Sequence, residues 1–182
     1  MRLVLLDRDG ILNEDRHDYV KTPDELVMIP GAAQAVARLN RAGYAVAICT
    51  NQSSIGRGIV SPETIERIHL RLAQHLAAVG AHVDAIFVCP DPPGPPSRCR
   101  KPAPGMLIDA LRQFHATPAE TPFFGDQLRD LEAATAAGCP RHLIRTGRGP
   151  ETQAVGLPAA VLPVSVHESL DAAVTAIIAA GG

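Results

Sequence analysis

Two aspartates, Asp7 and Asp9, follow directly after four aliphatic residues, 3–6, near the start of this 182-residue chain. Such a run is typical of a strand buried on both faces, as in a parallel sheet. Because ionised carboxylates are rarely buried without a partner, a pair at this point indicates an active site at the carboxyl edge of an α/β sheet. If the chain is still extended there, Asp7 and Asp9 share a side and Arg8 points away. An acidic turn that only ends the strand is the alternative.

Three further polar clusters, residues 50–54, 100–102 and 125–130, follow later apolar segments. Each has an ordinary structural explanation: a helix-capping loop, a solvated basic pair, and acidic residues that favour a helix N-terminus, as Asp130 would. All of them, however, fall after successive predicted strands, where α/β sheets bind ligands.

The chemistry of these clusters is complementary. Asp7, Asp9 and Asp126 are hard oxygen ligands suited to Mg²⁺, while Thr50 and Lys101 can bind phosphoryl oxygens. A carboxylate nucleophile, a metal ion and a cationic clamp together meet the needs of phosphoryl transfer, in which charge stabilisation dominates.

The rest of the chain alternates between strand and helix patterns, which predicts a three-layer, doubly wound parallel α/β sheet. Strands are expected at residues 3–6, 45–49, 85–88, 122–124 and 142–144, with a weaker one near 159–162. Helices are expected at 31–42, after the N-cap Ser61, at 104–115, at 127–137 and at 168–180. On the second helix, His69 and His75 do not share a face, and we expect both to be solvated. The proline-rich residues 90–104 predict an irregular surface loop.

The composition is that of a soluble globular protein, with 46% hydrophobic and 20% charged residues and a net charge of −2. We expect one domain over residues 1–182, a cytoplasmic monomer, and neither nucleic acid nor membrane as a partner, since there is no basic patch, signal-like segment or membrane-spanning run. Four scattered cysteines do not form a secreted disulfide framework, and Cys49 and Cys139 are expected to be reduced.

At these motifs the chain resembles the haloacid dehalogenase-like phosphohydrolases, whose four motifs occur here in the same order and over most of the chain. The resemblance implies that Asp7 attacks phosphorus to form an aspartyl-phosphate, and that Asp9 protonates the leaving alcohol and then activates water. Thr50 and Lys101 would hold the phosphoryl group. Arg8, between the two acids, would take no part in the chemistry.

The resemblance also implies Mg²⁺ on the Asp7 carboxylate, the Asp9 backbone carbonyl and Asp126. A cation there would screen the approach of a carboxylate to an anionic phosphate. An acid role for Asp9 near neutral pH requires its surroundings to raise its pKa.

Within this superfamily the chain is most similar to the heptose bisphosphate phosphatases, with histidinol phosphatases as relatives, through residues 50–58, 100–106 and 145–147. This implies Mg²⁺-dependent removal of the 7-phosphate of D-glycero-D-manno-heptose 1,7-bisphosphate, a step in heptose and lipopolysaccharide precursor synthesis. There is no room for a large cap domain, so loops 15–19 and 90–100 would shape an open site. Arg100 would meet the distal phosphate. The expected substrate-binding residues are Asp15, His17, Tyr19, Asn51, Gln52, Ser53, Arg100 and Lys101.

One position departs from the family, which often holds a structural zinc in the proline-rich loop. The corresponding residues here are Cys89, Asp91, Ser97 and Cys99, and serine is a poor zinc ligand. We therefore do not expect zinc, and the five prolines of residues 90–96 can stiffen the loop instead.

Two alternatives stay open at this point. One is a histidinol phosphatase, which shares the same motifs. The other is a phospho-receiver signalling domain, which also combines an acidic pair, a threonine and a lysine on a doubly wound sheet, but is shorter and places its phosphorylated aspartate on a later strand.

Overall fold

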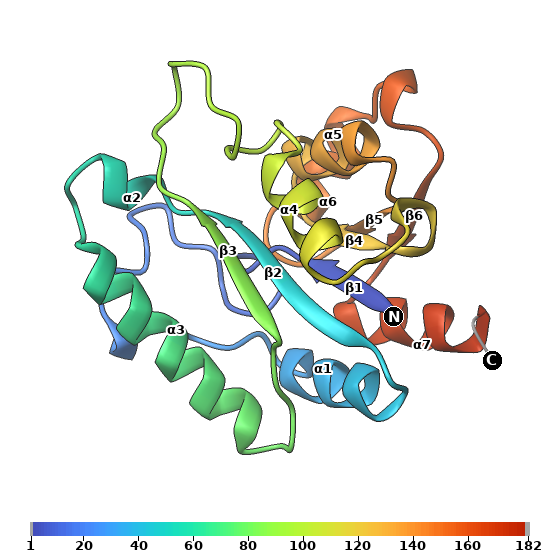
Figure 1. Cartoon of the computed structure of the whole chain (residues 1–182), viewed down its shortest axis with the longest axis horizontal. Coiled ribbons are helices and arrows are strands. Elements are labelled where there is room, and N and C mark those ends of the chain that lie inside the picture. Colours follow the sequence, from blue (N-terminus) through green and yellow to red (C-terminus); the bar gives the residue numbers. More distant parts are fainter. Residues whose placement is uncertain (1, 181–182) are drawn as a thin grey trace.

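The protein is built on a parallel six-stranded sheet in a computed structural model that describes residues 2–180 (Figure 1). The strand order is β3-β2-β1-β4-β5-β6, and every pairing is parallel. The strand that carries the aspartate pair is therefore central. The strands are β1 (Leu3–Leu6), β2 (Ala45–Asn51), β3 (Ala85–Cys89), β4 (Phe123–Gly125), β5 (Arg141–Ile144) and β6 (Val164–His167).

Helices cover both faces of this sheet, which confirms the predicted three-layer α/β architecture (Figure 1). Helices α1, α3 and α7 pack on one face, and α4 and α5 pack on the other. The helices are α1 (Ala32–Arg41), α2 (Ser53–Gly56), α3 (Pro62–Ala77), α4 (Gly105–Gln113), α5 (Leu128–Ala137), α6 (Gly149–Val155) and α7 (Leu170–Ala180).

Strand β1 is buried on both sides because its side chains alternate between two hydrophobic clusters. Leu3 and Leu5 pack towards α4 and α5, whereas Val4 and Leu6 pack towards α1, α3 and α7. Neither face of β1 is exposed to water. Charged residues can therefore follow only beyond the end of the strand, at the edge of the sheet. That edge is where Asp7 begins.

The structure confirms the sequence signals that predicted the start of a helix at Ser61. Ser61 caps α3 by accepting a hydrogen bond from the Thr64 amide at 3.2 Å, and Pro62 occupies the first helical position. The short helices α2 and α6 were not predicted, since neither is long enough to show a hydrophobic period. Residues 90–104 contain no helix or strand, as their prolines indicated.

The sixth strand was placed wrongly. The apolar residues near 159–162 form a short 3₁₀ helix, Ala159–Val161, and the strand is Val164–His167. Pro158 and Pro163 flank the apolar run and lack the amide hydrogens that a ladder needs. The true strand is less apolar because it lies at the sheet edge and is only partly buried.

Two histidines meet between β5 and β6. His142 Nδ1 lies 3.0 Å from His167 Nε2, and the His142 ring packs at 4.6 Å from the Phe124 ring. Burial, with a smaller effect of His167, lowers the pKa of His142 to about 4. The protein therefore holds His142 neutral where an unfolded chain would protonate it.

Acidification should destabilise the fold through His142. Its pKa is lower in the folded than in the unfolded state, so its contribution is complete above the unfolded value near ~6.5 and is lost as pH falls towards 4. The expected loss is on the order of 3 kcal/mol in the free energy of unfolding. Urea denaturation should show that the free energy of unfolding falls less between pH 7 and pH 4 in His142→Phe than in the unaltered protein. Equal declines would contradict this role.

No helix among residues 2–180 combines the length and the apolar character needed to cross a membrane.

Candidate active site

A buried lysine lies between two carboxylates at the floor of the site. Lys101 Nζ is 3.0 Å from Asp7 Oδ1 and 2.7 Å from Asp130 Oδ1, and Lys101 is only 1% exposed. Burial alone would lower the pKa of Lys101, but Asp130 and Asp7 together hold it above its usual range. Burial raises the pKa of Asp7 to about 6 against the opposing effect of Lys101. The lysine is therefore a fixed positive charge beside the predicted nucleophile.

The geometry leaves one oxygen of Asp7 available. Asp7 Oδ1 accepts a hydrogen bond from the Arg8 amide at 2.7 Å as well as the contact with Lys101. Asp7 Oδ2 has no protein hydrogen-bond partner within residues 2–180. The carboxylate is thus held through one oxygen, and the other can react or bind a cation.

Asp130 is a residue whose function the sequence did not reveal. It was read as a helix-dipole residue, and it does cap α5, where its Oδ2 accepts from the Gln127 amide at 3.0 Å. Its other oxygen holds Lys101. Asp130 is therefore both a cap and the second anchor of the lysine.

The carboxylates at this edge fit a divalent cation. Oxygens of Asp7, Asp126 and Asp130 lie within 4.8 Å of one another, and Asp126 Oδ1 is buried with no hydrogen-bond partner among the described residues. Burial and then the neighbouring carboxylates Asp130 and Asp7 raise the pKa of Asp126 to about 8. Because three carboxylates here face one ammonium group, a bound divalent cation would balance the two remaining negative charges. Asp130 is engaged by Lys101, which leaves Asp7 and Asp126 as the carboxylate ligands.

Replacing Asp126 should weaken Mg²⁺ binding. The Asp126→Asn variant keeps a ligand oxygen but loses a charge, so its Mg²⁺ dissociation constant should rise roughly 10- to 100-fold. Isothermal titration calorimetry in the absence of substrate measures this directly. Asp171→Asn, a surface aspartate paired with Arg38, is the matched control and should bind Mg²⁺ normally. An unchanged affinity in Asp126→Asn would place the metal elsewhere.

Asp9 is held by donors on both of its oxygens. Asp9 Oδ1 accepts from Arg8 Nη2 and Asn13 Nδ2, each at 2.9 Å, and Asp9 Oδ2 accepts from Gln52 Nε2 at 2.8 Å. Burial raises the pKa of Asp9, but Arg8 and these hydrogen bonds more than offset it, so the pKa is lowered overall. Asp9 is therefore a carboxylate in this structure, the form that accepts a proton.

Two expectations for this region are wrong. Arg8 does not point away from the acids; it is 1% exposed and its guanidinium returns to Asp9. His69 is not a freely solvated side chain: it is partly buried, and its Nε2 lies 3.1 Å from Arg8 Nη1. Burial and then Arg8 lower the pKa of His69 to about 4, so the ring is neutral beside the guanidinium. Arg8 alternates with the acids in sequence, but its long side chain can turn back where the strand ends.

The polar residues at the end of β2 and directly after it hold neighbouring parts of the site in place. Thr50 is fully buried, and its Oγ1 accepts from Gln52 Nε2 at 2.9 Å. Asn51 donates to the Lys101 carbonyl at 3.1 Å and accepts from the Lys101 amide at 3.0 Å. Ser53 Oγ donates to the Tyr19 hydroxyl oxygen at 3.4 Å. Asn51 thereby fixes the position of Lys101 across 50 residues of sequence.

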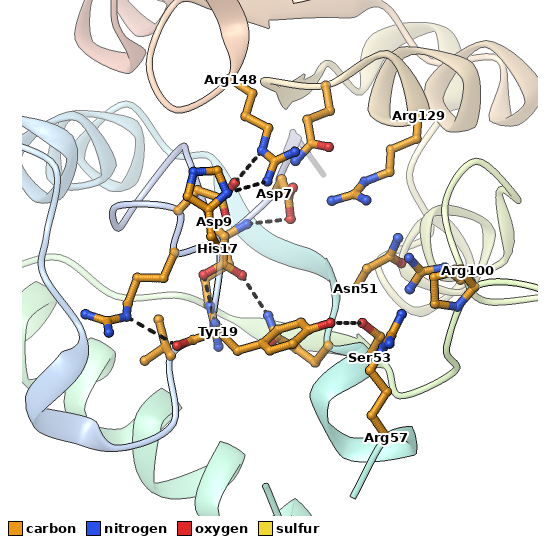
Figure 2. A pocket seen from close by; sticks show the side chains of 17 residues that line it. Asp7, Asp9, His17, Tyr19, Asn51, Ser53, Arg57, Arg100, Arg129 and Arg148 are labelled. Atoms are coloured by element: carbon orange, nitrogen blue, oxygen red, sulfur yellow. Dashed lines mark hydrogen bonds and ion pairs between the residues drawn. The ribbon is translucent and has the colours of Figure 1, made fainter. Parts of the chain in front are cut away.

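A pocket of about 240 Å³ opens above Asp7 and Asp9 (Figure 2). Seven of the eight expected substrate-binding residues line it, and Lys101 and Thr50 lie buried behind the lining. These seven are Asp15, His17, Tyr19, Asn51, Gln52, Ser53 and Arg100. The sequence did not predict further arginines in the lining, which are Arg8, Arg16, Arg57, Arg129 and Arg148.

Three arginines follow one another along one wall, Arg129, Arg100 and Arg57 (Figure 2). Burial and then the charges of Arg129 and Arg57 lower the pKa of Arg100. Neither Arg57 nor Arg129 has an ion-pair partner in the described part of the chain, and Arg129 Nε is buried without a hydrogen-bond partner. Because uncompensated guanidinium groups this close repel one another, this wall favours an anionic ligand.

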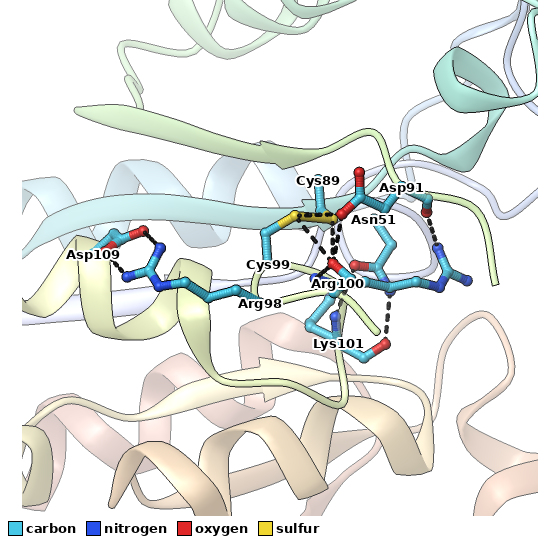
Figure 3. The surroundings of a disulfide bond; sticks show 9 residues. Asn51, Cys89, Asp91, Arg98, Cys99, Arg100, Lys101 and Asp109 are labelled. Carbon is cyan, nitrogen blue, oxygen red and sulfur yellow. Dashed lines mark hydrogen bonds and ion pairs between the residues drawn. A yellow bond between two sulfur atoms is a disulfide. The ribbon is translucent and has the colours of Figure 1, made fainter. Parts of the chain in front are cut away.

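The proline-rich loop that carries Arg100 is anchored by a disulfide between Cys89 and Cys99 (Figure 3). The four positions considered for zinc do come together: Ser97 Oγ donates to Asp91 Oδ2 at 2.6 Å and lies 3.7 Å from Cys89 Sγ. The cross-link occupies the two thiols that zinc would need as thiolates. The remaining cysteines, Cys49 and Cys139, are free and buried, as expected.

The anchored loop also sets the direction of Arg100. The Arg100 amide donates to Ser97 Oγ at 2.9 Å, and its Nη1 donates to the Asp91 carbonyl at 2.9 Å (Figure 3). Asp91 thus accepts a hydrogen bond from Ser97 with its side chain and another from Arg100 with its backbone carbonyl. The loop, which we expected its prolines to stiffen, is also held by the disulfide and these hydrogen bonds.

Comparison with known proteins gives consistent results. Residues 1–138 match the family model of the haloacid dehalogenase-like hydrolases. A Bordetella bronchiseptica protein named D-glycero-beta-D-manno-heptose-1,7-bisphosphate 7-phosphatase is 46% identical over 156 residues, which cover 86% of this chain and 87% of that protein. A Pseudomonas aeruginosa protein of the same name is 40% identical over 176 residues, 97% of each chain.

Solved structures agree with this. The crystal structure of the D,D-heptose 1,7-bisphosphate phosphatase from B. bronchiseptica, complexed with magnesium and phosphate, superposes with a TM-score of 0.94 at 43% sequence identity. That superposition covers 99% of both chains. The D,D-heptose 1,7-bisphosphate phosphatase from Burkholderia thailandensis superposes with a TM-score of 0.76 at 40% identity and covers 98% of this chain and 99% of that one.

Proposed function

This chain belongs to the haloacid dehalogenase-like hydrolases, and we propose that within this family it removes the 7-phosphate of D-glycero-D-manno-heptose 1,7-bisphosphate. The proposal rests on one observation: a single pocket contains two regions that can each bind a phosphate group. Within residues 2–180, Asp7 contacts Lys101 at the floor of the pocket through one carboxylate oxygen and keeps the other free, and the arginines of the adjacent wall form no ion pair with a carboxylate. A substrate with two phosphates matches both regions, and the names of the relatives support the same sugar.

The first half of the reaction needs a nucleophile and a proton donor. The free oxygen of Asp7 attacks phosphorus, the bond to the sugar oxygen breaks, and that oxygen takes a proton from Asp9. Lys101 stabilises the negative charge that collects on the phosphoryl oxygens. Since the donors around Asp9 favour its carboxylate form, the substrate must displace some of them before Asp9 can carry this proton.

The second half of the reaction regenerates the free carboxylate of Asp7. A water molecule attacks the aspartyl-phosphate, loses its proton to Asp9, and releases inorganic phosphate and the free Asp7 carboxylate. Here the Asp9 carboxylate of the structure is already in the form that accepts a proton. Mg²⁺ held by Asp7, the Asp9 carbonyl and Asp126 would offset the negative charge of the phosphoryl group and the acids.

The second phosphate would lie on the arginine wall. Arg100 is fixed by the disulfide-anchored loop and presents a forked donor, with Arg129 and Arg57 on either side. Each charged hydrogen bond of this type contributes about 1.5–3 kcal/mol, so losing one should cost roughly 10- to 150-fold in kcat/KM.

A substrate panel with Mg²⁺ tests the proposed function. The panel holds both anomers of heptose 1,7-bisphosphate, heptose 7-phosphate, histidinol phosphate and p-nitrophenyl phosphate, and phosphate release is measured for each. The bisphosphate should give the highest kcat/KM, and Arg100→Met should reduce its advantage over the monophosphate by roughly 10- to 150-fold. Arg98→Met, two residues away and paired with Asp109 on the surface, is the control. A preference for histidinol phosphate would refute the proposal.

A further inference from the structure

The connection between β5 and α6 packs directly on the catalytic centre. Thr146 Oγ1 donates to the Gly10 carbonyl at 2.6 Å. Gly147 has a φ of +52°, and a Cβ there would collide with Asp126 Oδ2 and lie 2.6 Å from the Gly10 Cα. Only glycine allows this approach between the connection, the loop after β1 and the carboxylate of Asp126.

Arg148 is the next residue in this connection, and its backbone amide contacts one of the two carboxylate oxygens of Asp126. Its backbone amide donates to Asp126 Oδ2 at 2.8 Å, while Thr152 Oγ1 donates to the Asp126 carbonyl at 2.8 Å. Asp126 Oδ1 is buried and has no hydrogen-bond partner in the part of the chain that the structure describes. The amide of Arg148 therefore occupies Oδ2 and leaves Oδ1 as the oxygen that would hold a cation.

The side chain of Arg148 reaches the loop that carries Asp15 and His17. Arg148 Nε donates to Asp15 Oδ2 at 2.9 Å, and its Nη2 lies 3.5 Å from His17 Nδ1 (Figure 2). Asp15 lines the pocket, and its Oδ1 has no protein partner within the described range. The loop that carries it has no regular structure, so contacts like this one determine its position.

We propose that Arg148 is a positioning residue for the sugar. It holds the Asp15 carboxylate so that Oδ1 faces the pocket and accepts hydrogen bonds from the hydroxyl groups of a polyol phosphate. Because its backbone orients Asp126 and its side chain orients Asp15, Arg148 sets the distance between the metal-bound phosphoryl group and the sugar hydroxyls. The proposal rests on the proposed function, since it takes a hydroxyl-rich phosphate ester as the substrate.

The alternative is that Arg148 binds a substrate phosphate itself. A double-mutant cycle separates the two roles. If Arg148 acts through Asp15, Arg148→Met should have little further effect once Asp15→Asn is present. If Arg148 contacts phosphate directly, the two losses should multiply, and the proposal would be wrong.

The test measures kcat and KM for heptose bisphosphate and for p-nitrophenyl phosphate, which has no hydroxyl groups to position. In Arg148→Met, KM for the sugar should rise about tenfold, and the ratio of kcat/KM values, sugar over aryl phosphate, should fall about tenfold. The Mg²⁺ dissociation constant, from calorimetry without substrate, should stay within about twofold because the amide remains. Arg145→Met is the matched control, since Arg145 lies in the same connection but pairs with Glu168 at the surface.

Equal losses for both substrates, or a parallel loss of Mg²⁺ affinity, would overturn the proposal and assign Arg148 a structural role. Failure of the proposed function gives a different result, which is an unaltered enzyme that does not prefer the heptose bisphosphate. The cycle is then run with the best polyol phosphate of the panel, where non-additivity supports the role of Arg148 and additivity refutes it.

Discussion

Asp7→Asn should lower kcat by at least about 10⁴-fold, because an amide oxygen cannot form the aspartyl-phosphate. The substitution is nearly isosteric, and Lys101 keeps Asp130 as a partner. The fold should therefore survive, with an unchanged circular dichroism spectrum. Single-turnover phosphate release measures the loss, and acid-quenched samples of the unaltered protein should contain the phosphorylated aspartate.

A matched control makes the result specific. Asp109→Asn removes a carboxylate that pairs with Arg98 at the surface, so it should leave kcat unchanged. If Asp7→Asn kept more than about 1% of the activity, nucleophilic attack by Asp7 would be excluded, given the size of the loss expected for a covalent step.

Lys101→Met should be the most damaging substitution for stability as well as for turnover. It leaves Asp7 and Asp130 buried without their cation, and breaking a buried pair in this way costs about 3–5 kcal/mol. Loss of the charge beside the phosphoryl group should also lower kcat by roughly 10²–10³-fold. Urea denaturation and steady-state kinetics measure the two effects separately.

Two further variants test the reason for the instability. Lys21→Met, the other lysine of the chain, removes a surface ion pair and should cost less than about 1 kcal/mol. In Lys101→Met/Asp130→Asn the charge of one of the two unpaired carboxylates is removed and the side-chain oxygen that caps α5 is kept, so part of the lost stability should return. If the double variant were as unstable as the single one, the cost would come from lost packing and not from an orphaned charge.

The sequence was sufficient for the fold and for the floor of the site because both depend on local patterns. An aliphatic run that stops at Asp7 specifies a buried strand and its end, and parallel strands bring such ends to one edge. The carboxylates Asp7 and Asp126 meet for this reason, and the hydrogen bonds with Asn51 hold Lys101, which the loop after β3 carries, beside Asp7. The sixth strand was misplaced because apolar content is a poor guide at a sheet edge, where Val164–His167 is only half buried.

The contacts that the sequence did not predict join residues far apart in the chain. Arg148 and Asp15 are separated by 133 positions, and Arg8 and His69 by 61. No periodicity or capping rule couples such residues, and each has an ordinary explanation as a solvated side chain. Asp130 received no role in the site for a related reason: its place in the first turn of a predicted helix gave it an ordinary explanation as a helix-dipole residue.

The arrangement of charge around the pocket has a consequence for how a substrate arrives. The chain as a whole carries a net charge of −2, yet arginines surround an opening whose floor is acidic. At physiological ionic strength, charges act over about 8 Å, so an approaching dianion is attracted by the guanidinium groups before the carboxylates can repel it. Electrostatic steering of this kind governs the rate of encounter and weakens as salt is added. We therefore expect the arginine wall to act on the diffusion of the substrate into the pocket as well as on its binding there.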